Sequence, residues 1–330
     1  MSPEFLAIFR AHADALGEMP FAQFMDLALY HPAAGYYRKK RKRVGYAAGT
    51  DFFTSSTSGP VFGELVAAAC AKLLRAAGRD PAAHTFVEMG AEPIDCARGT
   101  PEGGGVLAGV KHPFAAARAV RVGDSFDALA DDCVVFSNEL FDAQPFRRTV
   151  AHRGRWQQIG VRLENDCLIE AMPTDSAETE PAAARDGYRF DQPLAATVLA
   201  TQIARSPWRG LFVAIDYGKT LRELTEETPQ GTGRAYFQHT QSNDLLARPG
   251  EQDLTCHICW DWMGEALAGH GFAPPKLEFQ EAFFIRHAGE FIAASSAADA
   301  AGFSPRKLAL QQLLHPAHLG QKFQVLHAMR

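Results

Sequence analysis

The stretch that most constrains this chain is residues 134–145, VVFSNELFDAQP, where an apolar run changes abruptly to polar residues. Residues 134–136 are typical of a strand buried on both faces of a parallel sheet. Asn138, Glu139 and Asp142 follow at the position where open α/β sheets bind their ligands. A helix there would place Glu139 and Asp142 on one face. The alternative is that Asn138 caps this helix and both acids are solvated near its positive end.

The composition is that of an ordinary globular protein. The chain has 330 residues, of which 47% are hydrophobic and 22% charged, with a formal net charge of -5. This balance argues against general binding to nucleic acid. No apolar run is long enough to span a membrane, and the N-terminal segment predicts a short amphipathic helix with interspersed acids, unlike a secretory signal. We therefore expect a cytoplasmic protein.

Strand and helix patterns alternate along the chain, which predicts an α/β fold with a mostly parallel sheet. Two short helices are expected within residues 1–30, and a helix at 194–205. Strands are expected at residues 85–90, 119–122, 134–136, 210–216, 277–285 and 323–329, and a hairpin at 146–163. The strands at 85–90, 134–136 and 210–216 are predicted to be central and parallel, with their C-terminal ends facing one cleft.

Two contrasting segments precede the first long helix pattern, at residues 61–77. Residues 38–43 are six consecutive basic residues, and we expect them to be solvated and without fixed partners. Residues 49–56, GTDFFTSS, combine a glycine, hydroxyls and an acid with two aromatic rings, which suits a loop pressed against a ligand. The alternative for the second segment is a capped turn that leads into the helix.

The cysteines do not indicate a metal centre. Of six cysteines, only Cys256 and Cys259 form a C-x-x-C pair, with His257 between them, and no second pair completes four ligands. We expect both to be core cysteines near the start of a helix at residues 257–270.

Six segments, taken in order, resemble the MidA-like protein arginine methyltransferases of bacteria and mitochondria, whose mitochondrial members assist assembly of respiratory complex I. They are FMDLALYHPAAGYY, GTDFFTSSTSGPVFGEL, SNELFDAQP, IDYG, GRAYFQHT with DLTCH, and LLHPAHLGQKFQVL. The resemblance implies a class I, Rossmann-like methyltransferase fold that uses S-adenosylmethionine. It also implies an N-terminal helical region with a cofactor-covering loop at residues 1–78, and a core at 79–330 with a substrate-side insertion at about 219–256.

The resemblance also implies a set of site residues and a protein substrate, which could be a subunit of a respiratory complex. The expected catalytic residues are Asn138, Glu139 and Asp142, of which Glu139 and Asp142 would grip a guanidinium. The expected cofactor-binding residues are Asp51, Phe52, Thr54, Ser55, Glu88, Gly90, Gly123 and Asp124. The expected substrate residues are Asp216, Tyr217 and His239.

The chain departs from the family pattern after the first expected strand. Where the family has a glutamate, a glycine-rich turn and a Gly-Thr, residues 88–93 read EMGAEP, so that Glu88 and Gly90 remain but the rest of the turn does not. Two functions therefore stay open, which are an active arginine methyltransferase and a non-catalytic relative that acts as a binding or assembly factor. The sequence leaves the acceptor protein and the oligomeric state open.

Overall fold

The computed structural model describes residues 2–39, 43, 50–51, 55–91, 105–172, 177–178, 185–298 and 304–330. The chain forms two compact units, each built from three stretches. Unit 1 comprises Met1–Phe52, Phe141–Leu199 and Gly218–Met263, and unit 2 comprises Phe53–Leu140, Ala200–Tyr217 and Gly264–Arg330. The predicted division into residues 1–78 and 79–330 remains a prediction.

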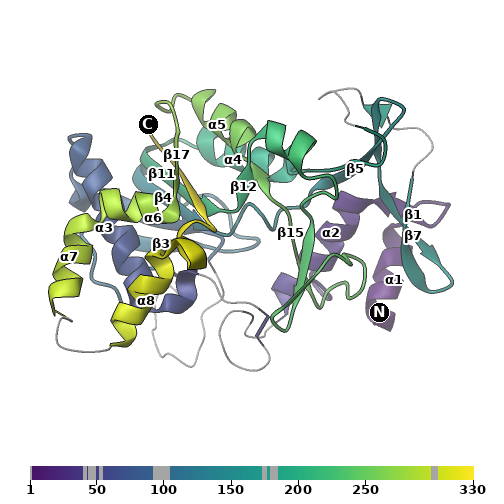
Figure 1. Ribbon diagram of the computed structural model, residues 1–330, viewed down its shortest axis with the longest axis horizontal. Coiled ribbons are helices and arrows are strands. Elements are labelled where there is room, and N and C mark those ends of the chain that lie inside the picture. The colour runs from purple at the N-terminus through teal and green to yellow at the C-terminus, as the bar shows by residue number, and fades with distance from the viewer. Residues whose placement is uncertain are drawn as a thin grey trace. The chain divides into compact units, whose positions relative to one another are not determined.

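Unit 2 is organised around a six-stranded sheet with the order β17-β18-β11-β4-β2-β3 (Figure 1). These strands are β2 (Thr85–Met89), β3 (Ala116–Val120), β4 (Asp131–Asn138), β11 (Trp208–Asp216), β17 (Lys276–Phe279) and β18 (Gln324–Met329). Neighbours among β3, β2, β4 and β11 pair in parallel, whereas β18 pairs antiparallel with both β11 and β17. The α/β class and the parallel arrangement of β2, β4 and β11 are confirmed, and the sheet as a whole is mixed.

The register of the parallel strands brings their C-terminal ends to one edge of the sheet. Asn138 of β4 lies opposite Ile215 of β11, and Met89 of β2 lies opposite Ser137 of β4. The polar residues that follow these strands therefore start from the same edge, as the sequence predicts.

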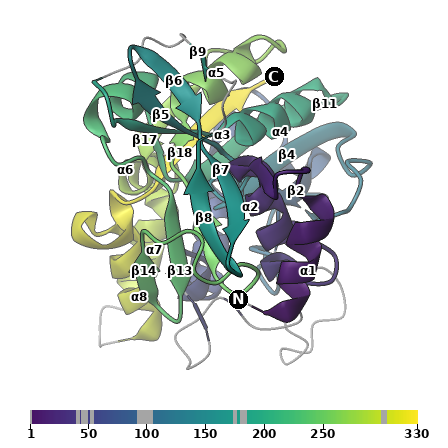
Figure 2. The same cartoon turned by 90° about the vertical axis from the view of Figure 1, so that its right-hand side faces the viewer.

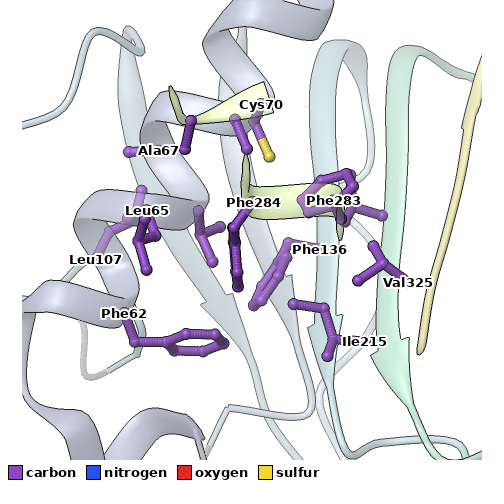
Figure 3. Close-up of a cluster of buried hydrophobic side chains, with 14 of the residues drawn as sticks. Phe62, Leu65, Ala67, Cys70, Leu107, Phe136, Ile215, Phe283, Phe284 and Val325 are labelled. Carbon is purple, nitrogen blue, oxygen red and sulfur yellow. The ribbon is translucent and has the colours of Figure 1, made fainter. Parts of the chain in front are cut away.

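Four helices pack with one face of this sheet, namely α3 (Pro60–Ala76), α6 (Gln280–His287), α7 (Gly289–Ala298) and α8 (Pro305–Leu314). Figure 3 shows the core that they share with the strands. The ring of Phe62 on α3 lies 6.1 Å from that of Phe284 on α6 and 6.4 Å from that of Phe136 on β4. Each such ring is fully buried and contributes about 1.5–3 kcal/mol.

The predicted strand at residues 277–285 is wrong in its second half. The strand β17 ends at Phe279, and the helix α6 begins at Gln280. The side chain of Gln280 is fully buried, and its amide donates to the backbone oxygen of Leu313, 3.0 Å away. Packing of Phe283 and Phe284 into the helical layer decides the structure here, because their apolar character alone fits either element.

Unit 1 contains the two predicted N-terminal helices, α1 (Pro3–His12) and α2 (Phe21–Tyr30), and several small sheets. One sheet has the order β1-β7-β8, formed by β1 (Glu18–Pro20), β7 (Gly160–Glu164) and β8 (Cys167–Ala171). Figure 2 shows β7 and β8 as a hairpin. A second sheet has the order β10-β5-β6-β9, formed by β5 (Arg147–His152), β6 (Arg155–Gln158), β9 (Ala177–Glu178) and β10 (Arg189–Gln192). The predicted hairpin at 146–163 is therefore divided, since β6 ends before Ile159 and β7 joins another sheet.

The segment after β11, which includes the predicted insertion at about 219–256, contains the π-helix η5 (Glu223–Glu227) and several short strands. The strands are β12 (Gly218–Lys219), β13 (Arg234–Phe237), β14 (Thr240–Ser242), β15 (Asp253–Thr255) and β16 (Ile258–Cys259). Two further helices, α4 (Leu194–Arg205) and α5 (Trp260–Ala268), pass from unit 1 into unit 2 along the chain. Within the described residues, no helix is both long and apolar enough to cross a membrane.

Candidate functional site

Ser137, Asn138 and Glu139 form the polar end of β4 at the carboxyl edge of the sheet in unit 2. The amide nitrogen of Asn138, Nδ2, donates to Glu139 Oε1 at 3.0 Å. The buried atoms Ser137 Oγ and Asn138 Oδ1 have no hydrogen-bond partner among the described residues. A buried acceptor without a donor is costly, so the edge is suited to a ligand that offers N–H or O–H groups.

Glu139 does not begin a helix, so both sequence-based interpretations of this stretch are wrong in that respect. Its backbone adopts a positive φ of 52°, its N–H donates to the oxygen of Ile215 at 2.9 Å, and residues 139–146 form bends and turns. A non-glycine residue in this conformation costs about 1–2 kcal/mol. Asn138 therefore does not cap a helix, and the helical spacing expected for Glu139 and Asp142 does not arise. Asp142 belongs to unit 1.

Glu88 lies near the C-terminal end of β2. Its carboxylate binds the backbone at Val106, close to Gly105, where the described residues resume. Its Oε2 accepts the N–H of Val106 at 2.5 Å. A side chain at Gly105 would place its Cβ 2.4 Å from the same oxygen and so displace the Glu88 carboxylate, and the φ of 142° at this position also favours glycine. Burial raises the pKa of Glu88 to about 7, although the Val106 hydrogen bond and the charge of Arg121 oppose this shift. Glu88 is therefore poised to change its charge near neutral pH.

Three other predicted cofactor residues of unit 2 lie in turns. Gly90 has a φ of 77° and donates its N–H to the oxygen of Val120 at 2.9 Å. Gly123 has a φ of 92°, and the exposed Asp124 accepts the N–H of Arg121 at 2.8 Å. These residues form the turns that follow β2 and β3.

Ser55 has a structural contact within unit 2. It is buried in the 3-10 helix η2 (Ser55–Ser58), and its hydroxyl donates to Gln280 Oε1 at 3.1 Å. The predicted cofactor residues Phe52 and Thr54 lie outside the described residues.

Asp216 is the last residue of β11, and Tyr217 follows it at the same edge. Asp216 is fully buried, and its Oδ1 accepts the N–H of Tyr217 at 2.8 Å. The ring of Tyr217 packs against that of Phe323, with 4.4 Å between centroids. Successive residues of a strand point to opposite faces, so Asp216 and the neighbouring Ile215 lie on different faces of the sheet.

In unit 1, the structure brings together Asp51 and His239, which were predicted for different roles. Asp51 is fully buried and accepts the Tyr36 hydroxyl at 2.7 Å and the Gln238 N–H at 3.0 Å. His239 donates its backbone N–H to the oxygen of Asp51, and its Nε2 lies 3.0 Å from Thr50 Oγ1. The sequence did not indicate the role of Tyr36 in holding Asp51.

Asp142 lies in unit 1 near a stack of two tyrosines. The rings of Tyr30 and Tyr37 are 5.5 Å apart and nearly parallel, and Tyr37 donates its hydroxyl to Asp253 Oδ1 at 2.9 Å. Burial raises the pKa of both phenols well above the usual value, and the charges of Asp253 and Asp142 raise it further. Both tyrosines therefore stay neutral beside two buried carboxylates.

The expectation that residues 38–43 lack fixed partners is wrong for Arg43. Its side chain is only 2% exposed, and it donates to the backbone oxygen of Lys39 at 3.1 Å. Its guanidinium carbon lies 5.3 Å from the ring centroid of Tyr37, at cation–π distance. Arg38 is exposed but donates to the oxygen of Tyr30 at 3.3 Å. Residues 40–42 lie outside the described part of the chain.

Cys256 and Cys259 are core residues, as predicted. Both are buried, and they belong to two different hydrophobic clusters of unit 1. Between them, burial lowers the pKa of His257 to about 4, with smaller contributions from the charges of Lys219 and Arg234.

Comparison with known proteins agrees with this arrangement. Residues 116–276 match a family assigned as S-adenosyl-L-methionine-dependent methyltransferases. A Burkholderia thailandensis protein thought to be a methyl transferase, solved with S-adenosyl-homocysteine bound, aligns over all of this chain and 94% of its own, with 26% identity and a TM-score of 0.83. A second structure from that organism, of an uncharacterized protein, aligns over the same shares with 25% identity and a TM-score of 0.79.

A named relative is the Drosophila melanogaster protein arginine methyltransferase NDUFAF7 homolog, mitochondrial. It is 25% identical over 306 residues, which are 76% of this chain and 66% of that protein. These comparisons support the resemblance to the MidA-like methyltransferase family that the sequence indicates. The enzyme class and the cofactor predicted from the sequence, a methyltransferase that uses S-adenosylmethionine, agree with these comparisons. The chain spans slightly less than two thirds of the named relative.

Proposed function

We propose that this MidA-like protein transfers a methyl group from S-adenosylmethionine to an arginine side chain of a partner protein. The main support for the proposal is the edge of the sheet where the C-terminal ends of β2, β4 and β11 meet. Glu88, Asn138, Glu139 and Asp216 all lie at this edge, within one unit. The Drosophila relative is named as a protein arginine methyltransferase homolog, which supports arginine as the acceptor. A cytoplasmic location and a respiratory-complex subunit as the partner remain predictions.

The residues at this edge fit the cofactor in their chemistry. Asn138 Oδ1 is a buried acceptor that lacks a donor among the described residues, and the amino and hydroxyl groups of S-adenosylmethionine are donors. Glu88, Gly90 and Asn138 are the residues of unit 2 that would hold it. The bound cofactor supplies an electrophilic methyl group on a sulfonium, so the protein has to provide orientation and a site free of water.

Glu139 is the residue we assign to the acceptor. A carboxylate holds a guanidinium through charge-assisted hydrogen bonds that fix its plane. Asn138 donates to Glu139 Oε1 and thereby orients the carboxylate, and the left-handed backbone at Glu139 turns the chain out of the strand. In this proposal Asp216 and Tyr217, which lie in the same unit as Glu139, contribute to the acceptor side, and the roles expected for Asp142 and His239 remain predictions.

The test compares wild type with Glu139→Gln, which removes the charge and keeps the shape. One charge-assisted hydrogen bond contributes about 1.5–3 kcal/mol, so methyl incorporation into lysate proteins from labelled S-adenosylmethionine should fall about tenfold or more. The calorimetric affinity for S-adenosylmethionine should hardly change. Glu164→Gln, at an exposed position of β7, is the matched control and should behave as wild type.

The alternative function is a non-catalytic binding or assembly factor. The stretch at residues 88–93 favours it, because the sequence there departs from the glycine-rich family turn. If wild-type protein gave no calorimetric heat with S-adenosylmethionine and no methyl incorporation, the enzyme proposal would be wrong. The binding or assembly factor would then be the supported function.

A further inference from the structure

A cluster of potential metal ligands lies in unit 2 where β17, α6 and β18 meet. Glu278 Oε1 is 2.9 Å from His287 Nε2 and 3.0 Å from His327 Nε2. The potential ligand atoms of the three residues all lie within 4.8 Å of one another. Each of the three elements contributes one residue, so the cluster joins segments that are distant in the sequence.

The cluster is held by rigid elements and is shielded from water. The side chains of Glu278, His287 and His327 are 8%, 14% and 5% exposed. Phe283 packs against both imidazoles, with its ring centroid 5.0 Å from that of His287 and 5.4 Å from that of His327. Pairing of β17 with β18 fixes the backbones of Glu278 and His327. Ligands on paired strands and a helix keep their geometry better than ligands on loops.

The two carboxylate oxygens of Glu278 have different neighbours, since Oε1 lies beside both imidazoles and Oε2 pairs with an arginine. Arg286 pairs with the other carboxylate oxygen, Oε2, and its side chain is 64% exposed, so Oε1 faces the two imidazoles.

We propose that Glu278, His287 and His327 bind a divalent transition-metal ion, with Zn²⁺ as the best match. Two imidazole nitrogens and one carboxylate oxygen form a ligand set that holds Zn²⁺ with a fourth position for water. Mg²⁺ and Ca²⁺ prefer oxygen ligands. On binding, each Nε2 needs a lone pair toward the metal, so the proton that it shares with Glu278 Oε1 moves to Nδ1 or is released to solvent. The ion would join the edge strand β17 to the C-terminal strand β18.

The test is calorimetric titration of the full chain, freed of metal by a chelator, with ZnCl₂ and separately with MgCl₂. The proposal expects one Zn²⁺ per chain and no heat from Mg²⁺. Glu278→Gln and His287→Gln should each weaken Zn²⁺ binding by more than about 100-fold, because even changes to groups that only orient a ligand cost about 10–100-fold. Zn²⁺ should raise the melting temperature of wild type and of neither variant.

The matched control is His318→Ala. His315 and His318 form an exposed pair with 5.2 Å between ring centroids, and this pair is the competing place for Zn²⁺ in unit 2. The variant should bind Zn²⁺ as wild type does. Co²⁺ in place of Zn²⁺ should give the visible absorption of a tetrahedral site in wild type.

Three results would overturn the proposal. They are wild type without Zn²⁺ heat, unchanged affinity in Glu278→Gln and His287→Gln, and loss of binding in His318→Ala. Circular dichroism of the metal-free variants confirms that each is folded. Using two variants, on β17 and on α6, keeps the test valid if one of them fails to fold.

Discussion

Glu88 in unit 2 and Asp51 in unit 1 are both acids predicted to bind cofactor, but their surroundings differ. The carboxylate of Asp51 is fully buried and accepts hydrogen bonds from the Tyr36 hydroxyl and the Gln238 N–H. That of Glu88 accepts the Val106 N–H, and burial raises its pKa to about 7. Asp51 thus has the bonding of an acid that organises its own unit, whereas Glu88 can change its charge near neutral pH. The sequence pattern around each acid does not distinguish these two cases.

The strongest test of this contrast is the removal of Asp51. Asp51→Ala leaves the Tyr36 hydroxyl and the Gln238 N–H without this acceptor. Two hydrogen bonds to a charged group contribute about 1.5–3 kcal/mol each, so the free energy of unfolding should fall by about 4 kcal/mol. Urea unfolding measures this fall. Tyr36→Phe removes one of the two bonds and should cost about half as much. A stable Asp51→Ala protein with weakened cofactor binding would assign Asp51 to a site instead.

The second test uses the raised pKa of Glu88. Its folded-state pKa of about 7 lies above the usual value of 4.5, so the folded protein binds this proton more tightly than the unfolded chain. The stabilisation is complete below pH 4.5 and is lost as the pH rises through about 7. With 1.36 kcal/mol per pKa unit, the loss amounts to about 3 kcal/mol.

Wild type alone cannot report this loss, because His257 in unit 1 titrates in the opposite sense. Burial lowers its pKa from 6.5 to about 4, so its contribution is complete above 6.5 and is lost as the pH falls. The measurement is therefore the difference between wild type and Glu88→Gln in urea unfolding, at about pH 5 and about pH 8. Glu88→Gln should be relatively more stable at the higher pH. A difference that does not change with pH would mean that the carboxyl of Glu88 has an ordinary pKa.

The main strands of unit 2 were predictable because their signals are local. Residues 134–136 and 211–215 are continuous apolar runs, and β4 and β11 are each paired with a strand on both sides. The same locality explains why the start of α6 was missed. Phe283 and Phe284 fit a strand or a helix equally well until α3 and α8 are in place. Tertiary packing decides such ambiguous segments.

At the candidate site, residue types were easier to predict than contacts. The acids and the amide after β2, β4 and β11 follow from the strand pattern, and the register brings them to one edge. The left-handed backbone of Glu139 was not predictable, since its N–H is bound by Ile215, 76 residues later in the chain. The contact of Glu88 with Val106 is also non-local. A glycine at position 105 was its only sequence signal.

The smallest expected effect concerns Arg43, whose burial contradicts the solvated basic run predicted from the sequence. Arg43→Ala removes a hydrogen bond to the oxygen of Lys39 and the cation–π contacts with Tyr36 and Tyr37. Together these contribute about 2 kcal/mol to the free energy of unfolding. Arg38→Ala, at an exposed position of the same run, is the matched control and should cost about 0.5 kcal/mol or less. Urea unfolding of the two variants side by side tests the difference.

Tyr36 also donates its hydroxyl hydrogen bond to Asp51, so a large effect of Arg43→Ala would show that this arginine is part of the buried network of unit 1. Equal and negligible effects of Arg43→Ala and Arg38→Ala would mean that Arg43 is solvated, as the sequence predicted for the whole basic run. They would also weaken the contrast between Asp51 and Glu88.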